Sequence, residues 1–157
     1  MAIFTGDEIF QLAMELEETG EVFYEAVAAG CGNASVADLC RRLAEQEKQH
    51  YRTFEDMRKR LAARPEARPL TWEEMKFAQG LINDRLIPGP EEARRIAAGG
   101  SLTETIDLAI RLENDSVEFY TELLPAVEEG DREAVARIIE EERRHARELT
   151  AARRDAH

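Results

Sequence analysis

Two copies of the motif E-x-x-H are the part of this sequence best suited to chemistry. One copy runs from Glu47 to His50 and the other from Glu142 to His145. A spacing of three residues brings a carboxylate and an imidazole onto one face of a helix, where both can bind the same cation. A single E-x-x-H on a solvated helix face would mean little, so its repetition is the stronger signal.

The motif belongs to an internal repeat. The segment LEETGEVFYEAV in the first half resembles LENDSVEFYTEL in the second half. Glu17 corresponds to Glu113 with an offset of 96 (113 − 17), and Glu47 to Glu142 with an offset of 95 (142 − 47). Each half therefore contributes one further glutamate in addition to its E-x-x-H.

The elements that must position these residues are predicted to be four long helices, which makes the fold class all-α. Helical periodicity extends over about 6–29, 34–63, 102–124 and 131–153. Gly30 and Gly32 separate the first pair, and Pro125, Gly130 and an N-cap at Asp131 separate the second. Short, long and short connections are typical of a ferritin-like four-helix bundle made of two helical hairpins.

We expect a single domain over 1–157, with one hairpin over about 6–63, a long crossover over about 64–101 and a second hairpin over about 102–153. The crossover stretches TWEEMKFAQGLI and PEEARRIAA are predicted short helices, and Trp72 is expected to anchor this segment on the bundle. Capping boxes are predicted at Thr5–Glu8, Thr71–Glu74 and Ser101–Glu104.

The glutamates and histidines fall within apolar seams. Along the second predicted helix, apolar residues and the E-x-x-H pair alternate at steps of four and three, which places Glu47 and His50 at core positions. The fourth helix repeats this pattern. Glu17 and Glu47 both lie about 18 to 21 Å from the first turn at about 1.5 Å per residue. All six side chains are expected to meet in one layer if the hairpins dock with their turns at the same end.

Four buried carboxylates require compensating charge, because each ion loses several kcal/mol of hydration and like charges repel. Two divalent ions supply four positive charges, and the imidazoles add nitrogen donors. Mixed carboxylate and imidazole ligands suit iron or manganese. The sequence thus predicts a two-metal site formed by Glu17, Glu47, His50, Glu113, Glu142 and His145.

At these residues the chain resembles the rubrerythrin branch of the ferritin-like superfamily. The matching segments are E-E-T-G-E-V-F-Y from Glu17, E-K-Q-H from Glu47, E-N-D-S-V-E-F-Y from Glu113 and E-R-R-H from Glu142. The resemblance implies two iron ions per site, with manganese or a mixed pair as alternatives. It also implies that Glu47 and Glu142 bridge the ions, that Glu17 and Glu113 are terminal ligands, and that His50 and His145 each bind one ion.

Two departures from the family pattern affect the expected function. Full-length rubrerythrins carry a rubredoxin module with two CxxC pairs, which this chain lacks, so the expected electron donor is a separate rubredoxin-like protein. Some rubrerythrins have an additional carboxylate one turn after the third-helix ligand, where this chain has Ser116.

The first functional hypothesis is a di-iron oxidoreductase that reduces hydrogen peroxide, or oxygen, with electrons from that donor. The first alternative is a ferroxidase or iron-storage protein that uses the same ligands. The second alternative is a metal-free helical interaction module. A homodimer is expected, with the exchange of hairpins between chains left open.

Several other residues have simpler interpretations. Tyr24 and Tyr120 lie two turns from Glu17 and Glu113 and are the candidate catalytic residues, whose hydroxyls would hydrogen-bond a ligand carboxylate or a bound oxygen species. The alternative is that both rings simply pack in the core. Cys40 lies on the seam as an apolar filler, and Cys31 lies near the first turn.

Composition restricts the remaining function classes. The formal net charge is −12, from 33 acidic and 21 basic residues, which disfavours nucleic acid and anionic membranes as partners. Neither a leader peptide nor a membrane-spanning run is evident. A cytoplasmic protein is therefore expected.

Overall fold

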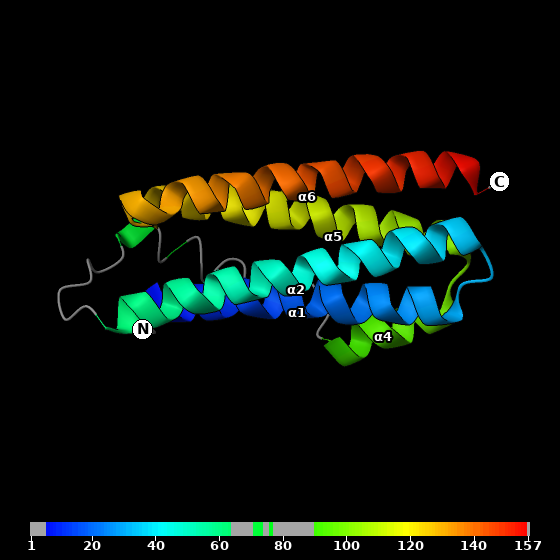
Figure 1. The fold of residues 1–157 in the computed structure, drawn as a ribbon, viewed down its shortest axis with the longest axis horizontal. Coiled ribbons are helices and arrows are strands. Elements are labelled where there is room, and N and C mark those ends of the chain that lie inside the picture. Colours follow the sequence, from blue (N-terminus) through cyan, green and yellow to red (C-terminus); the bar gives the residue numbers. More distant parts are fainter. Residues whose placement is uncertain (1–5, 64–70, 74–75, 77–89, 157) are drawn as a thin grey trace.

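A computed structural model describes residues 6–63, 71–73, 76 and 90–156, and every regular element in these ranges is a helix (Figure 1). The elements are α1 (Gly6–Gly30), α2 (Ala34–Ala62), α4 (Pro90–Gly99), α5 (Leu102–Leu123), the short 3-10 helix η1 (Leu124–Ala126) and α6 (Glu129–Asp155). The all-α, ferritin-like prediction is confirmed.

The four long helices form two antiparallel hairpins, α1 with α2 and α5 with α6, which lie against each other lengthwise (Figure 1). The turn between α1 and α2 lies at one end of the bundle, and the turn between α5 and α6 lies at the other. The packing is consistent with turns at opposite ends, because Ile9 near the start of α1 lies in one apolar cluster with Val127 of the second turn. The condition stated for a common layer, that both turns lie at the same end, is therefore not met.

The predicted layer forms nevertheless, because the relevant glutamates and histidines lie near the middle of their helices. A residue at mid-helix has the same height whichever end it is measured from. The two hairpins consequently resemble two copies related by a two-fold rotation about an axis perpendicular to the bundle, with α1 corresponding to α5 and α2 to α6 (Figure 1).

The helix ends show which local signals were informative. Asn33 caps α2 by accepting a hydrogen bond from the Val36 amide, and Ser101 and Glu104 form the predicted capping box of α5. Asp131 is not an N-cap, however, because η1 and the extended residue Val127 complete the turn earlier and α6 begins at Glu129. The Asp131 carboxylate instead pairs with Arg60 at 2.7 Å.

The crossover is only partly described. The predicted helix PEEARRIAA is confirmed as α4, which packs against α1 and buries Ala93 completely. Trp72 does not anchor the crossover by burial, because 60% of its surface is exposed, and α4 provides the described contact with the bundle. Thr5, Glu74 and most of TWEEMKFAQGLI lie outside the described residues.

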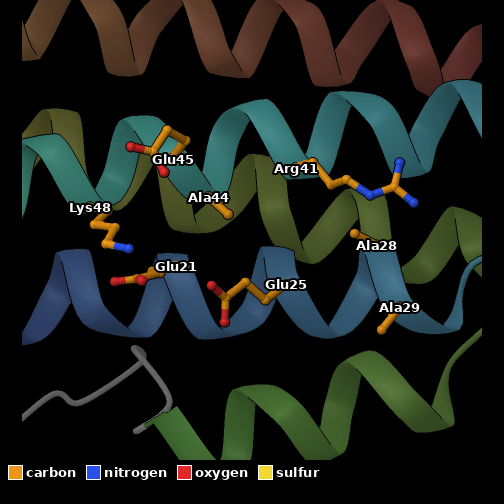
Figure 2. A pocket seen from close by; sticks show the side chains of 8 residues that line it. All are labelled: Glu21, Glu25, Ala28, Ala29, Arg41, Ala44, Glu45 and Lys48. Carbon is orange, nitrogen blue, oxygen red and sulfur yellow. The ribbon is translucent and has the colours of Figure 1, made fainter.

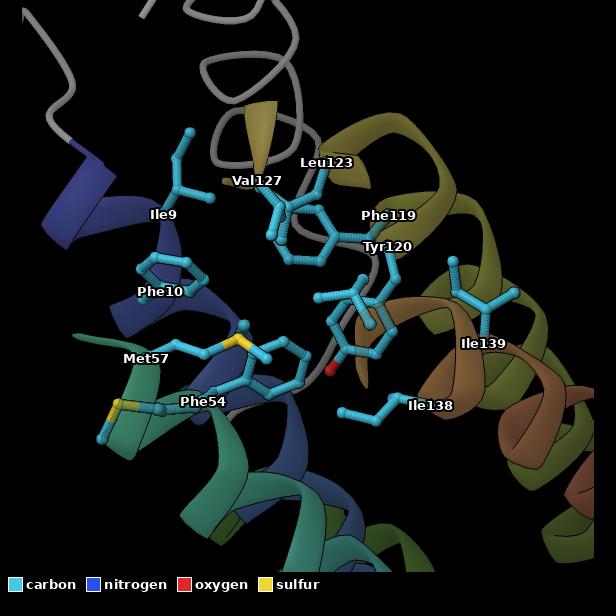
Figure 3. Packing of buried hydrophobic residues seen from close by; sticks show 13 residues of the cluster. Ile9, Phe10, Phe54, Met57, Phe119, Tyr120, Leu123, Val127, Ile138 and Ile139 are labelled. Atoms are coloured by element: carbon cyan, nitrogen blue, oxygen red, sulfur yellow. The ribbon is translucent and has the colours of Figure 1, made fainter. Parts of the chain in front are cut away.

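Two apolar clusters fill the bundle on either side of its middle. Figure 3 shows the first, in which Phe54 of α2 packs against Tyr120 of α5 with ring centroids 5.0 Å apart. The second lies towards the other end and includes Phe23, Leu43 and Ile106, each at most 2% exposed. The polar residues between these clusters are thus isolated from bulk water along the bundle axis.

None of the helices in the described part of the chain combines the length and apolar character that a bilayer-spanning segment requires.

Candidate metal centre

Six buried side chains from four helices converge between the two apolar clusters. They are the six predicted from the sequence, and each is at most 4% exposed: Glu17 from α1, Glu47 and His50 from α2, Glu113 from α5, and Glu142 and His145 from α6. All six come from one chain, so a single copy assembles the complete constellation.

The six residues form two overlapping groups of four. The first cluster is Glu17, Glu47, His50 and Glu142, and the second cluster is Glu47, Glu113, Glu142 and His145. In each cluster, one potential ligand atom from each residue lies within 4.8 Å of all the others. Because Glu47 and Glu142 belong to both clusters, the arrangement is that of two adjacent cation positions that share two carboxylates.

The shared carboxylates each direct one oxygen to each histidine. Oε1 of Glu142 lies 3.1 Å from Nδ1 of His50, and its Oε2 lies 3.1 Å from Nδ1 of His145. Glu47 does the same at longer range, with its Oε2 3.6 Å from His50 Nδ1 and its Oε1 3.5 Å from His145 Nδ1. The two imidazole rings stack with centroids 5.9 Å apart. This placement fits Glu47 and Glu142 as bridging residues.

Two tyrosines cross from one hairpin to the other to hold the unshared glutamates. The Tyr24 hydroxyl donates a hydrogen bond to Oε1 of Glu113, and the Tyr120 hydroxyl donates one to Oε1 of Glu17 at 2.5 Å. Both rings are almost completely buried. Of the two interpretations offered for these residues, the structure therefore shows the hydrogen-bonding one, directed at the glutamate of the opposite hairpin.

Each histidine also contacts a partner on its outer side. Nε2 of His50 lies 2.5 Å from Oε2 of Glu141, and Nε2 of His145 lies 2.6 Å from Oε1 of Gln46. Neither partner was among the residues predicted from sequence. The signal that could have found them is their position, since Gln46 directly precedes Glu47 and Glu141 directly precedes Glu142.

The crowded carboxylates favour retention of protons. Burial, together with the charges of Glu47 and Glu142, raises the pKa of Glu17 well above its usual range. Burial and Glu142 raise the pKa of Glu113 to about 8. Burial and Glu47 act in the same direction on Glu142, but hydrogen bonds from Glu113 and both histidines outweigh them and lower its pKa.

The same crowded carboxylates favour the protonated, positively charged form of both imidazoles. Burial disfavours the charged form of both rings, but the surrounding carboxylates outweigh it. The pKa of His145 rises to about 12 through its hydrogen bonds to Glu113, Glu142 and Glu47, and the pKa of His50 is raised through Glu17 and Glu142. Without a cation, the cluster therefore holds protons at neutral pH.

The donor set fits a pair of divalent cations. Oε2 of Glu17 is buried yet accepts no hydrogen bond from any described residue, although it lies 3.5 Å from Nδ1 of His50. A cation bound among these ligand atoms would supply the partner that this buried carboxyl oxygen lacks. Four carboxylates and two imidazole nitrogens would balance two divalent ions, and these ligand types suit iron or manganese.

A small pocket reaches this centre from the side of α1 and α5. It is lined by Leu16, Thr19, Gly20, Tyr24, Glu47, Leu112, Glu113 and Ser116, and its cavity volume of about 10 Å³ is roughly that of one water molecule. Gly20 keeps it open, because a Cβ at this position would lie 3.2 Å from Cγ of Glu47. Gly20 thus permits close packing against Glu47, and the small residues Gly20 and Ser116 both line the opening.

A larger hollow of about 290 Å³ lies on the outer face of α1 and α2 (Figure 2). Its charged lining residues are Glu21, Glu25, Arg41, Glu45 and Lys48. No residue of the first or second cluster lines it. It is therefore separate from the buried centre.

The cysteines lie outside the centre. Cys40 is 2% exposed within the second apolar cluster, where burial raises the pKa of its thiol to about 12. This confirms its interpretation as an apolar filler. Cys31 is partly exposed at the first turn and contacts Asn33, and both cysteines are free.

Comparison with known proteins agrees with this geometry. A crystal structure from Thermotoga maritima, described as that of a ferritin-like diiron-carboxylate protein, superposes with a TM-score of 0.73 and 26% sequence identity. The match covers 100% of this chain and 99% of that one. Comparison with curated protein sequences gave no match.

The family model for rubrerythrin matches residues 8–153, which include all four long helices of the bundle almost entirely and all six residues of the two clusters. Family membership, the bundle and the buried carboxylate and histidine cluster all indicate a metal site. This chain belongs to the rubrerythrin family.

Proposed function

We propose that this protein is a di-iron oxidoreductase that reduces hydrogen peroxide to water with electrons from a separate donor protein. The observation that carries the proposal is the pair of overlapping four-residue clusters that share Glu47 and Glu142. Two positions that share two carboxylates would hold two ions side by side, where both could act on one small molecule. A pair of ferrous ions bound there would supply two electrons, which with two protons convert one hydrogen peroxide into two waters.

The residues of the chain have distinct roles in this proposal. Glu17 and His50 would complete one ion position and Glu113 and His145 the other, while the shared glutamates hold both. Because four carboxylates balance two divalent ions, the buried centre would be nearly neutral in its reduced state.

The surroundings favour a small oxidant. The pocket beside Glu113 admits a molecule of about the size of one water, and apolar clusters close the bundle above and below the centre. Tyr24 lines this pocket while it holds Glu113, so its hydroxyl group lies where an entering oxidant would arrive. A peptide, a nucleotide or another large substrate would not fit. Electrons would have to reach the buried centre from a donor docked on the surface.

The test is a single-turnover experiment without oxygen. The protein is loaded with Fe(II) and mixed with one equivalent of hydrogen peroxide per ion pair, and both the absorbance of the oxidised iron and the iron released are followed. We expect one peroxide to oxidise both ions, the iron to remain bound, and dithionite to restore the starting state for further cycles.

Two outcomes would contradict the proposal. Slow or absent oxidation by peroxide would exclude peroxide reduction. Rapid oxidation by oxygen with many ions accumulating per chain would indicate iron storage, which uses the same ligand set.

A further inference from the structure

The inner ligands of the two clusters match in type, but the outer partners of their histidines do not. His50 has the Glu141 carboxylate as its outer partner, at 2.5 Å, whereas His145 has the Gln46 carboxamide, at 2.6 Å. Gln46 and Glu141 are equivalent in the internal repeat, with an offset of 95 (141 − 46). The two halves of the repeat therefore differ in residue type at this pair of equivalent positions.

We propose that Glu141 and Gln46 are positioning residues that make the two metal positions unequal, so that the first cluster binds a divalent cation more tightly than the second. This inference rests on the proposed two-metal site. It concerns residues that would touch no cation themselves but contact the histidines.

The geometry distinguishes the two nitrogens of each imidazole ring. In both rings Nδ1 faces the shared carboxylates, while Nε2 faces outward. When Nδ1 binds a cation, Nε2 keeps its hydrogen and donates it to the outer partner. This contact sets the tautomer and the orientation of the ring, and it also affects how strongly Nδ1 donates electrons.

A carboxylate and an amide differ in this role. A hydrogen bond to an ionised acceptor is roughly twice as strong as one to a neutral acceptor, and it draws the N–H proton further from the ring. The His50 ring therefore becomes the more electron-rich ligand. Its cation also gains from the additional negative charge of Glu141, which the neutral Gln46 cannot supply to the second cluster.

The outer partners also link the two hairpins. Glu141 on α6 contacts His50 of α2, and Gln46 on α2 contacts His145 of α6. Each hairpin thus orients the histidine of the other. Both contacts are partly buried, and the Glu141 side chain keeps 30% exposure, so a carboxylate is tolerated at this position.

The test measures anaerobic Fe(II) and Co(II) binding by calorimetry in proteins restricted to one position. Glu113→Ala leaves the first cluster complete, and Glu17→Ala leaves the second. In the first background, Glu141→Gln should weaken binding about 10-fold, as substitution of a residue that hydrogen-bonds a ligand typically does. In the second background, Gln46→Glu should tighten binding several-fold. The matched controls place Gln46→Glu in the Glu113→Ala background and Glu141→Gln in the Glu17→Ala background. In these controls the binding constant should stay within about twofold of that of the background protein.

The same substitutions in the chain with all six ligands make the test independent of those backgrounds. There, Glu141→Gln should weaken the tighter of two binding steps and bring the two constants together. A purely structural role would instead weaken binding for both substitutions. The opposite signs for Glu141→Gln and Gln46→Glu are therefore the diagnostic result.

The outcomes separate the inference from the proposed function. Two ions bound with equal constants that neither substitution changes would overturn the inference and leave the two-metal site standing. Weakening by both substitutions would also overturn it. Failure of the unmodified protein to bind Fe(II) or Co(II) would overturn the two-metal site itself.

Discussion

The two hairpins contribute the same inner groups to the centre but different outer ones. Each supplies one glutamate, one E-x-x-H and one tyrosine that holds the glutamate of the other hairpin. Outside this shell the halves differ, with Glu141 against Gln46 and Ser116 against Gly20. If the centre holds two cations as proposed, their binding would constrain the inner residues equally in both halves, and the outer residues would make the two positions distinct.

The largest expected effect distinguishes shared from unshared glutamates. Glu142→Ala should reduce bound Fe(II) below one ion per chain, because it removes an oxygen from both clusters. Glu17→Ala and Glu113→Ala should each retain about one ion. Metal analysis after anaerobic loading measures this, with Glu140→Ala on the exposed face of α6 as a control that should retain two. Equal losses from all three cluster variants would contradict the bridging assignment.

The metal-free centre should make stability depend on pH. Glu113 has an ordinary pKa of 4.5 and a folded value of about 8, and His145 has 6.5 and about 12. A group whose pKa is raised by folding stabilises the protein below its unfolded pKa, and this stabilisation is lost as pH rises through the folded value. The lowered pKa of Glu142 affects stability only below about pH 4.5, which is outside the pH range of the test.

The metal-free protein should consequently have a lower Tm at pH 8 than at pH 5.5, by several degrees, since about 1 kcal/mol shifts the Tm of a domain of this size by about 2–4 °C. Added Mn(II) displaces the protons, so its stabilising effect should be larger at pH 8. Calorimetric scans at both pH values provide the measurement. A Tm of the metal-free protein that rises over this range would show that the centre does not hold these protons.

The tyrosine contacts should be equivalent in the two halves. Tyr24→Phe and Tyr120→Phe each leave a buried carboxyl oxygen without its hydrogen-bond donor, which typically costs about 1–3 kcal/mol. Urea unfolding of the metal-free proteins should show similar losses for both. Tyr51→Phe on the partly buried face of α2 is the control and should change stability little. A large loss at only one of the two positions would show that the hairpins are not equivalent even in their inner shell.

The smallest effect concerns the small residues at the pocket. The Cβ of Gly20→Ala would press on Cγ and Cδ of Glu47, at 3.2 and 3.3 Å, and displace a shared carboxylate. We expect Fe(II) binding to weaken a few-fold, while unfolding changes by less than about 1 kcal/mol because alanine favours a helix over glycine. Ser116→Ala should leave binding nearly unchanged. Tighter Fe(II) binding by the Gly20→Ala protein would show that Glu47 does not need the space that this glycine leaves.

Residue type and periodicity were sufficient to predict that these six residues meet in the core. Glutamates and histidines in apolar seams are stable only when cations or protons compensate their charge. Their height along the bundle was also predictable, but the direction of the second hairpin was not, since mid-helix residues coincide in either orientation. Glu141 and Gln46 were missed because a polar residue beside a seam looks like part of a solvated face. The start of α6 was misplaced because a 3-10 turn at Pro125 replaced the expected cap.

Counting bound Fe(II) in the oxygen-free protein tests the central claim most directly. Equilibrium dialysis of the apoprotein against increasing Fe(II), followed by iron and protein determination, gives the number of ions per chain. The two overlapping clusters predict saturation at two ions per chain, with Glu142→Ala abolishing that plateau. Saturation at one ion, no binding, or uptake that continues far beyond two would contradict a dinuclear centre formed by these six residues.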